Sequence, residues 1–505
     1  MNHIVIVGGG TAGVVLAARL SEDPSCTVTL VEAGSAGDTP AELRDGGSLP
    51  AIAPGHAANW GYQALLQPES DIIVPRGRIL GGSSAINGGY VIRARSRDFA
   101  GWAQVGGPEW SYESALPLLK KLENDLDFGD RPVHGNQGPL TLRRPPQWRG
   151  LAVLFAQAAK ELGFSEEEDK NGDSGTIGVG AVPSNIIDGV RVNTAMAYLA
   201  DARQRDNLRI MGDTRVLRVL IEHGKAVGVE TDNGVIDADE VVLAAGAVAT
   251  PHLLMLSGIG PHEQLATCGI PLVADLPVGQ DFSDHPNLSV GWHASIPLVD
   301  PAERCAFPSA LNFDSSGADG QYPDGDLEVL LSVKPLRLLV NPDLASEPAE
   351  GADEYHVMVS LQAPKGRGCM TLVSGDPLTQ PRIDYNYLNN ESDRQRMRVG
   401  VRTAARLLTS ASFAAVFRAF ASLTDDILGN DALLDEWIGT HLSTAIHLSG
   451  SAPIGPVVDG QGRVHGVSAL RVADTSILPT VPSRGTFNAA VFIGEFIAHR
   501  MSETR

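Results

Sequence analysis

Several features that mark particular classes of protein are scarce or missing in this sequence. Its 505 residues include only four cysteines, Cys26, Cys268, Cys305 and Cys369, which are widely spaced and form no C-x-x-C pair. This distribution is typical of reduced thiols in a cytosolic protein and argues against a disulfide framework or a zinc site. No apolar run approaches the roughly 18 residues that a membrane span needs. Because the first apolar run begins at Ile4, there is no room for a signal peptide, and we expect a cytoplasmic protein without a transmembrane segment.

Positively charged residues are also few compared with negatively charged ones. The sequence has 39 Lys and Arg residues against 60 Asp and Glu residues, which gives a formal net charge of −21. Such an acidic protein is poorly suited to nucleic acid or to anionic membrane surfaces. The proportions of hydrophobic residues (43%) and charged residues (20%) are those of a globular chain. The length exceeds what one hydrophobic core usually holds, so we expect two structural regions in one body.

A glycine-rich motif near the start gives the first indication of chemistry. Gly8, Gly10 and Gly13 form a G-x-G-x-x-G pattern between the apolar run 4–7 and an Ala- and Leu-rich helical stretch. The first glycine allows a tight turn, the second a close approach of pyrophosphate, and the third close packing of helix and strand. Glu32 follows at the end of the next predicted strand, where a carboxylate can bind ribose hydroxyls and repel a 2′-phosphate. The unit predicts dinucleotide binding and leaves the choice between FAD and NAD open.

The spacing of apolar residues predicts the remaining elements. Helical periodicity covers residues 111–125, 149–162, 433–446 and 487–501. Short strands are expected over 208–245, with a hairpin at Asn233-Gly234, and antiparallel strands at 327–331 and 355–361 indicate a second region. The glycine-rich segment 75–92 is predicted to be an irregular loop around a ligand.

Four blocks of sequence together resemble the glucose-methanol-choline (GMC) family of flavoprotein oxidoreductases. The blocks are residues 77–87, 246–260, 278–286 and 470–479. The resemblance implies an α/β FAD-binding Rossmann-like domain of the GMC type and a second α+β substrate domain built on an antiparallel sheet. It divides the chain into FAD-binding parts at 1–160, 185–288 and 455–505 and a substrate domain at 289–454.

The resemblance also implies FAD as the cofactor. The residues expected to bind it are Gly8, Gly10, Thr11, Ala12, Gly13, Glu32, Ala33, Arg78, Gly81, Gly82, Ser83, Asn87, Gly88, Val216, Asp474 and Thr475. Some family members bind FAD covalently through a histidine that follows the Gly-Gly-Ser-Ser element. Ala85 and Ile86 stand there in this chain, so we expect non-covalent FAD.

The resemblance identifies His447, in the block 445–455, as the base that takes the hydroxyl proton while the flavin takes a hydride at N5. The family has a second reactive position, usually Asn or His, in the segment after Pro479. A count without gaps puts Phe487 there, and a one-residue bulge would bring in Asn488, so both stay candidates. We expect His441 to be structural, because it would face away from His447 on one continuous helix. Neither it nor His465 has the acidic or cysteine neighbours of a metal site, and none is predicted.

The leading function is therefore an FAD-dependent alcohol dehydrogenase. Residues 123–130 and 447–453 resemble the mycofactocin-associated branch of the family, whose members would oxidise mycofactocinol and pass electrons to a quinone or another respiratory-chain component. A small or aryl alcohol is the competing substrate, and oxygen is the competing acceptor, which would make the protein an oxidase. A GMC-fold lyase of the hydroxynitrile lyase type with non-redox FAD, and a binding protein without catalysis, are two further alternatives. An NAD enzyme has the least support.

Overall fold

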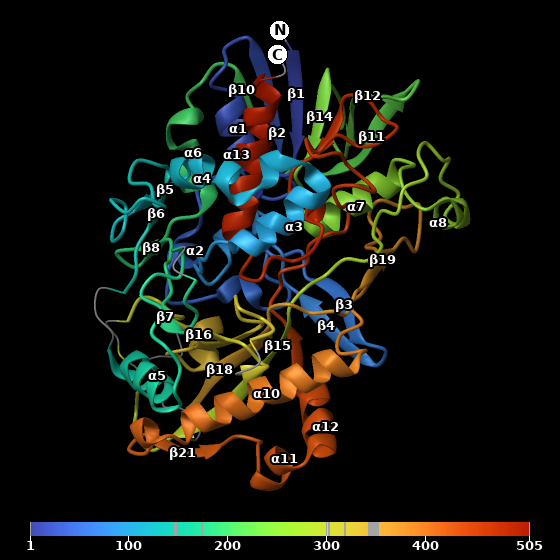
Figure 1. The fold of residues 1–505 in the computed structure, drawn as a ribbon. Coiled ribbons are helices and arrows are strands. Elements are labelled where there is room, and N and C mark those ends of the chain that lie inside the picture. The colour runs from blue at the N-terminus through green and yellow to red at the C-terminus, as the bar shows by residue number, and fades with distance from the viewer. Residues whose placement is uncertain are drawn as a thin grey trace.

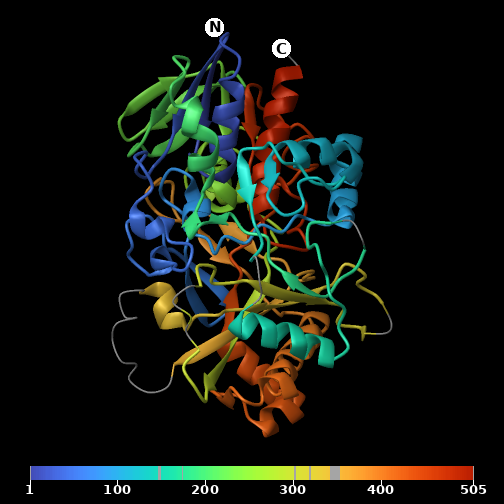
Figure 2. The same cartoon turned by 90° about the vertical axis from the view of Figure 1, so that its left-hand side faces the viewer.

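Two sheets at opposite ends of the molecule organise the chain. The computed structural model describes residues 2–145, 149–172, 175–298, 300, 303–317, 320–341 and 353–503. Figures 1 and 2 show an elongated body with both marked chain ends at the end that holds β1 and β2, and with β15, β18 and α10 in the other half. Each half has its own sheet, and the two halves meet over a large cavity.

The first sheet is parallel and has five strands in the order β10-β2-β1-β14-β23. The strands are β10 (Leu208–Met211), β2 (Cys26–Val31), β1 (Asn2–Val7), β14 (Glu240–Leu243) and β23 (Leu470–Val472). Helices α1 (Thr11–Leu20) and α13 (Phe487–Glu503) lie side by side against it. Two glycines permit this packing. A Cβ on Gly13 would lie 1.9 Å from the Gly8 carbonyl oxygen, and one on Gly494 would lie 2.9 Å from the Ala12 carbonyl oxygen.

The second sheet has seven strands, and all its pairings are antiparallel. Its main order is β21 (Phe417–Phe420), β15 (Pro286–Ala294), β18 (Glu354–Leu361), β17 (Leu327–Leu331), β16 (Ser309–Phe313) and β7 (Val179–Ala181), and β22 (Leu442–Thr444) also pairs with β15. Helix α10 (Glu391–Leu408) packs against β15, β17 and β18. The sheet thus has one face against α10, and side chains of its other face line the cavity.

The smaller sheets and the other helices complete the body. The remaining strands are β3 (Tyr62–Gln67), β4 (Ser70–Val74), β19 (Cys369–Thr371) and β20 (Arg382–Asp384) in one sheet, β11 (Val216–Glu222), β12 (Lys225–Thr231) and β13 (Gly234–Asp237) in another, and the pairs β5 (Glu123–Asp125) with β6 (Leu140–Leu142) and β8 (Ile186–Ile187) with β9 (Val190–Arg191). The remaining α-helices are α2 (Ala41–Arg44), α3 (Ser96–Gly106), α4 (Tyr112–Lys121), α5 (Gly150–Glu161), α6 (Thr194–Ala202), α7 (Gly246–Leu256), α8 (His262–Thr267), α9 (Leu336–Val340), α11 (Asp425–Gly429) and α12 (Asp431–His441).

Most elements predicted from the sequence are confirmed. The hairpin at Asn233-Gly234 joins β12 and β13, with Thr231 opposite Gly234. The predicted strands 327–331 and 355–361 fall in β17 and β18 of the antiparallel sheet, and the predicted helix 487–501 lies within α13.

Two predicted helices end earlier than the apolar pattern suggests. The helix predicted over 111–125 ends as α4 at Lys121, because residues 123–125 pair with β6. The helix predicted over 433–446 ends as α12 at His441, because residues 442–444 pair with β15. In both segments, bonds to a strand outside the segment outweigh local helical preference. The argument that His441 and His447 face opposite sides of one helix is therefore wrong.

Candidate active site

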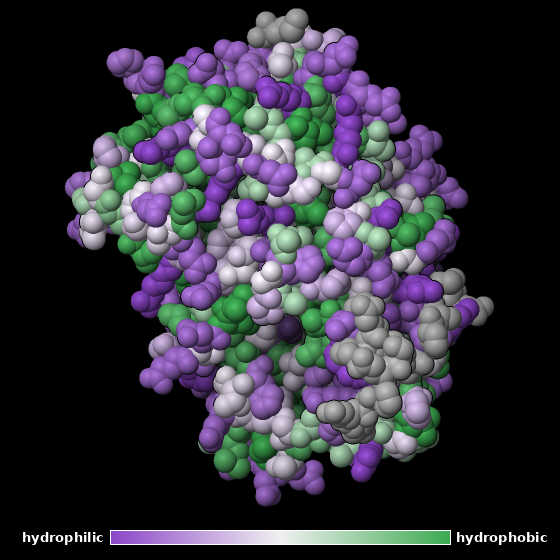
Figure 3. All heavy atoms as spheres, turned by 180° about the vertical axis from the view of Figure 1, so that it is seen from behind, coloured by the Kyte–Doolittle hydropathy of each residue, from purple (hydrophilic) through white to green (hydrophobic). Residues whose placement is uncertain are grey.

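A cavity of about 850 Å³ lies between the two halves of the molecule. On one side it is bordered by the carboxyl ends of β1, β2 and β14, which is where open parallel sheets bind ligands. On the other side it is bordered by side chains from β15, β17 and β18. Figure 3 shows that the surface is hollowed on the back of the molecule, with hydrophobic and hydrophilic residues around the recess. The volume and position suit a large ligand that reaches from the parallel sheet to the antiparallel sheet.

The nucleotide end of the cavity has the features that a dinucleotide requires. Helix α1 begins at Thr11 after Gly10, and no side chain caps its first turn, so its first N–H groups can face a pyrophosphate. A Cβ on Gly82 would lie 2.6 Å from the Gly10 Cα, so the two glycine-rich loops touch beside this turn. This contact explains why position 82 needs glycine. The donor set and the open helix turn fit the diphosphate of FAD.

Glu32 lies in the cavity wall at the end of β2 and is 6% exposed. Its Oε2 accepts the Gly9 N–H at 2.9 Å, and its Oε1 accepts the Gly34 N–H at 2.8 Å. Burial raises the pKa of this carboxyl, and the two backbone N–H groups act in the opposite direction. The side chain is therefore held at the position where a ribose hydroxyl would meet it.

The other predicted cofactor residues mostly meet at the same cavity. Those in its wall are Gly8, Gly10, Thr11, Ala12, Glu32, Ala33, Arg78, Gly82, Ser83, Asn87, Gly88, Val216, Asp474 and Thr475. Gly13 and Gly81 are not among the described wall residues. Gly13 serves the packing of α1, and Gly81, with a φ of +93°, donates its N–H to the Gly9 carbonyl at 2.7 Å. Both thus shape the loops that border the cavity.

Asp474 fixes the start of α7 beside the cavity. Its Oδ2 accepts the Gly246 N–H at 2.9 Å and the Thr250 hydroxyl at 2.6 Å, and its Oδ1 accepts the Ser476 N–H at 2.9 Å. Burial raises the pKa of Asp474, and these donors act against that rise. The carboxylate therefore has a structural part in addition to its place in the wall.

His447 lies in the wall on a strained turn that follows β22. The preceding residue, Ile446, has a φ of +65°, which is rare for a β-branched residue. Its N–H donates to the Thr444 hydroxyl at 2.8 Å, and its carbonyl accepts from Arg76 Nη1 at 2.6 Å. These bonds on both sides hold the unusual backbone that turns His447 toward the cavity.

A second histidine contacts His447 directly. His285 is completely buried just before β15, and its Nδ1 lies 3.0 Å from the Nδ1 of His447, with the two ring planes at 88°. The Asp284 carboxylate accepts the backbone N–H of His285 at 2.6 Å and that of His447 at 2.8 Å, and it accepts the Thr444 hydroxyl at 2.9 Å. One buried carboxylate thus fixes the backbones of both histidines.

Both histidines are neutral near pH 7. Burial lowers the pKa of His447 to about 3, and the positive charge of Arg76 contributes in the same direction. Burial also lowers the pKa of His285 well below its usual value, and His447 adds to that effect. A neutral imidazole has one nitrogen with a free lone pair, which is the form that can accept a proton.

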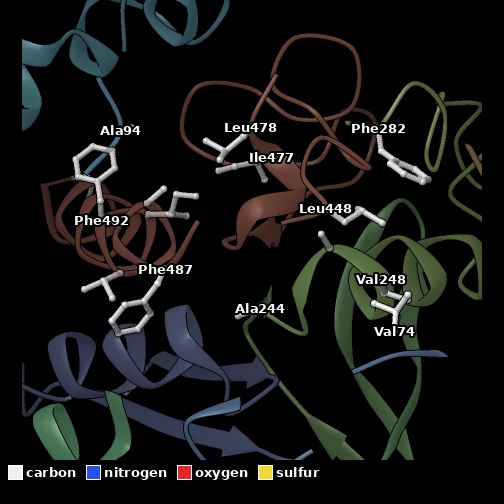
Figure 4. Packing of buried hydrophobic residues seen from close by; sticks show 14 of the residues in the cluster. Val74, Ala94, Ala244, Val248, Phe282, Leu448, Ile477, Leu478, Phe487 and Phe492 are labelled. Carbon is white, nitrogen blue, oxygen red and sulfur yellow. The ribbon is translucent and has the colours of Figure 1, made fainter. Parts of the chain in front are cut away.

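The two candidates for the second reactive position are placed differently. Phe487, the first residue of α13, lies in the cavity wall. Asn488 is 1% exposed, is not among the described wall residues, and has an Nδ2 without a hydrogen-bond partner among the described residues. Figure 4 shows Phe487 and Phe492 of α13 among the buried apolar side chains. The structure therefore brings a phenyl ring, rather than an amide, to the cavity from this helix.

Sequence reasoning missed the side chains that support His447. Asp284 and His285 belong to the block 278–286, which gave a family match without a role for either residue. Arg76 lies in the loop that was predicted to surround a ligand. Two polar residues of the cavity wall, Glu328 of β17 and Tyr90, were also missed. The Glu328 carboxylate accepts the Tyr90 hydroxyl at 2.7 Å. Only the Asp-His-Pro sequence ahead of an apolar strand offered a signal.

Glu123, Asp125 and His134 form a buried group with the composition of a metal site, which the sequence analysis did not identify. The two ring nitrogens of His134 face carboxylates, with Nδ1 3.0 Å from Glu123 and Nε2 2.8 Å from Asp169. Arg144 contacts Asp125 at 2.8 Å. Carboxylates only accept hydrogen bonds, so both nitrogens carry protons and neither has a lone pair for a metal. We interpret the group as an ion network.

Two further features concern disulfide bonds and membrane-spanning helices. None of the four cysteines forms a disulfide. Within the described ranges, no helix is both long enough and apolar enough to cross a membrane.

Known proteins resemble this chain along nearly its whole length. The family profile described as GMC oxidoreductase matches residues 2–287 with its N-terminal part and 364–494 with its C-terminal part. An uncharacterised GMC-type oxidoreductase from Rhodococcus erythropolis is 39% identical over 97% of this chain and 96% of its own. The 5-(hydroxymethyl)furfural oxidase of Methylovorus sp. (strain MP688) is 33% identical over 98% of this chain and 97% of its own.

Solved structures agree. The crystal structure of pyridoxine 4-oxidase from Mesorbium loti has a TM-score of 0.90 and 28% identity over 100% of this chain and 99% of its own. The family profile, the relatives and the fold indicate the same kind of protein as the glycine-rich loops and the cavity, namely an FAD-binding oxidoreductase. The chain therefore belongs to the GMC oxidoreductase family and is an FAD-dependent oxidoreductase that acts on CH–OH donors.

Proposed function

We propose that this protein is an alcohol dehydrogenase in which His447 is the catalytic base. The observation that carries the proposal is a neutral histidine in the cavity wall with Nδ1 bonded to His285 and Nε2 without a partner among the described residues. FAD, when bound, supplies a hydride acceptor at N5. His447 takes the hydroxyl proton on Nε2, so that the O–H bond breaks as the N–H bond forms. The residues of the glycine-rich loops, Glu32 and the Asp474 segment are the proposed holders of the cofactor.

Two substrate classes remain in the proposal. Mycofactocinol is favoured by the resemblance of 123–130 and 447–453 to the mycofactocin-associated branch, and a small or aryl alcohol is the alternative. Residues 123–125 belong to the buried ion network, so this segment supports a relationship and supplies no substrate contact. The wall of the antiparallel sheet carries Asn287, Glu328 and Ser360 in one row, which suits a hydroxyl-bearing molecule.

We also propose that FAD is bound without a covalent bond, because neither Ala85 nor Ile86 has a side chain that can form one. The proposed acceptor is a quinone or another respiratory-chain component, and oxygen is the alternative. The proposed location is the cytoplasm, which the lack of a disulfide among the four cysteines supports.

The test is an anaerobic absorbance spectrum of the flavin-loaded protein before and after addition of mycofactocinol and a panel of alcohols, followed by air. Bleaching by one compound with slow recovery in air supports the dehydrogenase, and fast recovery supports an oxidase. Conversion of a cyanohydrin without bleaching would support the lyase. A flavin that no compound affects would favour a binding protein.

A further inference from the structure

We propose that His285 is the positioning residue of the active site, which keeps the proton of neutral His447 on Nδ1 and leaves Nε2 free to act as the base. The inference rests on the proposed function of His447 and extends it to a residue that only the fold brings near, since the two histidines are 162 positions apart. The residue that positions His447 is thus placed just before β15. The first turn of α13 cannot supply it, because the side chain of Phe487 has no polar atom.

The contact itself requires one shared proton. Both rings are neutral, and their Nδ1 atoms are 3.0 Å apart, so one Nδ1 must donate and the other must accept. The distance and the buried position of His285 therefore couple the tautomers of the two rings. If one ring changes its tautomer, the bond between them is kept only if the other ring changes too.

The surroundings of His285 favour one of the two arrangements. The backbone carbonyls of Pro482 and Gln362 raise the pKa of His285, against the stronger effect of burial. Its Nε2 is buried, although no described acceptor reaches it with normal hydrogen-bond geometry. Because Nδ1 of His285 faces His447, we place these carbonyls on the Nε2 side of the ring, where an oxygen that can only accept favours a proton on Nε2. Nδ1 of His285 is then the acceptor, and Nδ1 of His447 is the donor.

The arrangement also stabilises the product of proton transfer. When His447 gains a proton on Nε2, its Nδ1–H to His285 becomes a charge-assisted bond, which is roughly twice as strong as a neutral one. Among the residues that the structure describes, no carboxylate side chain contacts either ring. The charged or titratable groups that act on the pair are Arg76 and Arg484, which disfavour its protonation, and Asp284, which binds the two backbones. Within the described part of the chain, His285 is therefore the side chain placed to support an imidazolium at 447.

The backbone frame makes the pair rigid. Asp284 accepts both backbone N–H groups, Arg76 holds the carbonyl of Ile446, and the Tyr387 hydroxyl donates to the His285 carbonyl at 3.4 Å. These bonds are made to backbone atoms, so they remain when the His285 side chain is replaced. Substitutions at 285 therefore test the side chain rather than the fold of the turn.

The first experiment measures the tautomer directly. In flavin-loaded protein labelled with ¹⁵N-histidine and without substrate, we expect the resonances of His447, assigned with His447→Gln, to show a protonated Nδ1 and a bare Nε2. In His285→Leu we expect a mixture of both tautomers. A protonated Nε2 at His447 in the unsubstituted protein would overturn the proposal.

The second experiment measures flavin reduction by the alcohol that bleaches the flavin fastest. His285→Leu should slow reduction by about 100-fold with little change in the apparent substrate affinity, as general base catalysis is worth 10²–10⁴-fold. His285→Asn, whose amide oxygen can accept from His447, should recover most of the rate. The matched control is His293→Asn on the same strand, outside the described cavity wall, which should keep the full rate.

The outcomes separate the two proposals. If His285→Leu retains both the tautomer and the rate, His285 is a packing residue and the inference fails. If the tautomer is as expected but no alcohol reduces the flavin, the proposed function fails and the positioning role stands. If His285→Leu does not fold, the spectrum of the unsubstituted protein and the His285→Asn variant still decide between the two tautomers.

Discussion

At the scale of single residues, the chemistry depends on the protonation state of His447. Its pKa lies near 3 because of burial and Arg76, so the folded protein keeps this ring neutral where a free histidine would be protonated. A base with a depressed pKa loses its lone pair only when the pH falls to that pKa. We therefore expect the rate of flavin reduction to stay level between about pH 8 and pH 5, without the decline that an ordinary imidazole shows below about pH 6.5. Stopped-flow reduction across this range, with unfolding monitored by circular dichroism, measures it.

His447→Gln removes the base and should lower the rate constant for flavin reduction by at least about 10³-fold, while the flavin spectrum stays unchanged. His465→Gln is the control, because His465 is exposed and its ring bonds, among the described residues, to the Gly455 carbonyl alone. A His447→Gln variant that reduces its flavin at the normal rate would exclude His447 as the base.

Glu328→Gln tests the substrate wall. The Tyr90 hydroxyl and Asn312 Nδ2, at 3.0 Å, both donate to the same carboxylate oxygen, Oε2. A glutamine with its carbonyl oxygen in that place keeps both bonds, but it removes the negative charge and turns the other oxygen from an acceptor into a donor. We expect about a tenfold rise in KM for a substrate with a second hydroxyl group and little change in kcat, equivalent to about 1.4 kcal/mol. Equal KM values for the variant and the unsubstituted protein would show that the wall makes no such contact.

At the scale of elements, glycines at α1 set how closely the cofactor-binding helix approaches the sheet. Gly13→Ala would place a Cβ 1.9 Å from the Gly8 carbonyl oxygen, which must move the helix or the strand. We expect loss of bound FAD and a fall in stability of at least about 2 kcal/mol. The matched control is Gly101→Ala in α3, where nothing lies within 4 Å and a gain of roughly 0.5–1 kcal/mol is expected. Flavin content after purification and the midpoint of thermal unfolding report both effects.

Elements defined by local signals were predictable from the sequence, and those defined by remote pairing were not. The turn at Gly8 and the hairpin at Asn233-Gly234 need particular backbone angles, which glycine reveals. Strands β5 and β22 were read as helix because their partners, β6 and β15, cannot be identified from local spacing. The same limit applies to the site. A motif identified His447, whereas His285 joins it only through the pairing of β22 with β15.

At the scale of the whole molecule, we propose the domain division stated from the sequence, with FAD-binding parts at 1–160, 185–288 and 455–505 and a substrate domain at 289–454. The parallel sheet draws its strands from the three FAD-binding parts, which supports the division. Strand β7, at 179–181, joins the antiparallel sheet from a segment that the division leaves unassigned.

The buried ion network around His134 joins β5 to more distant segments and predicts a pH dependence of stability. Burial acts to lower the pKa of His134, but hydrogen bonds to Asp125, Asp169 and Glu123 raise it to about 10. A raised pKa stabilises the fold fully below the unfolded value of about 6.5, and the benefit disappears as the pH rises through about 10.

His134→Gln should therefore lower the free energy of unfolding by about 2–3 kcal/mol at pH 6, after allowance for solvent screening, and the difference from the unsubstituted protein should shrink between pH 7 and pH 10. Thermal unfolding across this range, with His465→Gln as the exposed control, measures it. A difference that is constant with pH would mean that the His134 ring contributes by packing rather than by charge.

The order of strands in the parallel sheet has a consequence for biosynthesis. Strand β1 begins at Asn2, but its neighbour β14 pairs with β23 at Leu470–Val472, and Phe487 completes the cavity wall. A nascent chain on the ribosome holds the phosphate-binding turn long before it holds the far side of the same pocket. Chains truncated before β23 should therefore emerge without flavin and depend on chaperones, and coenzyme loading is a step that follows the synthesis of β23 and Phe487.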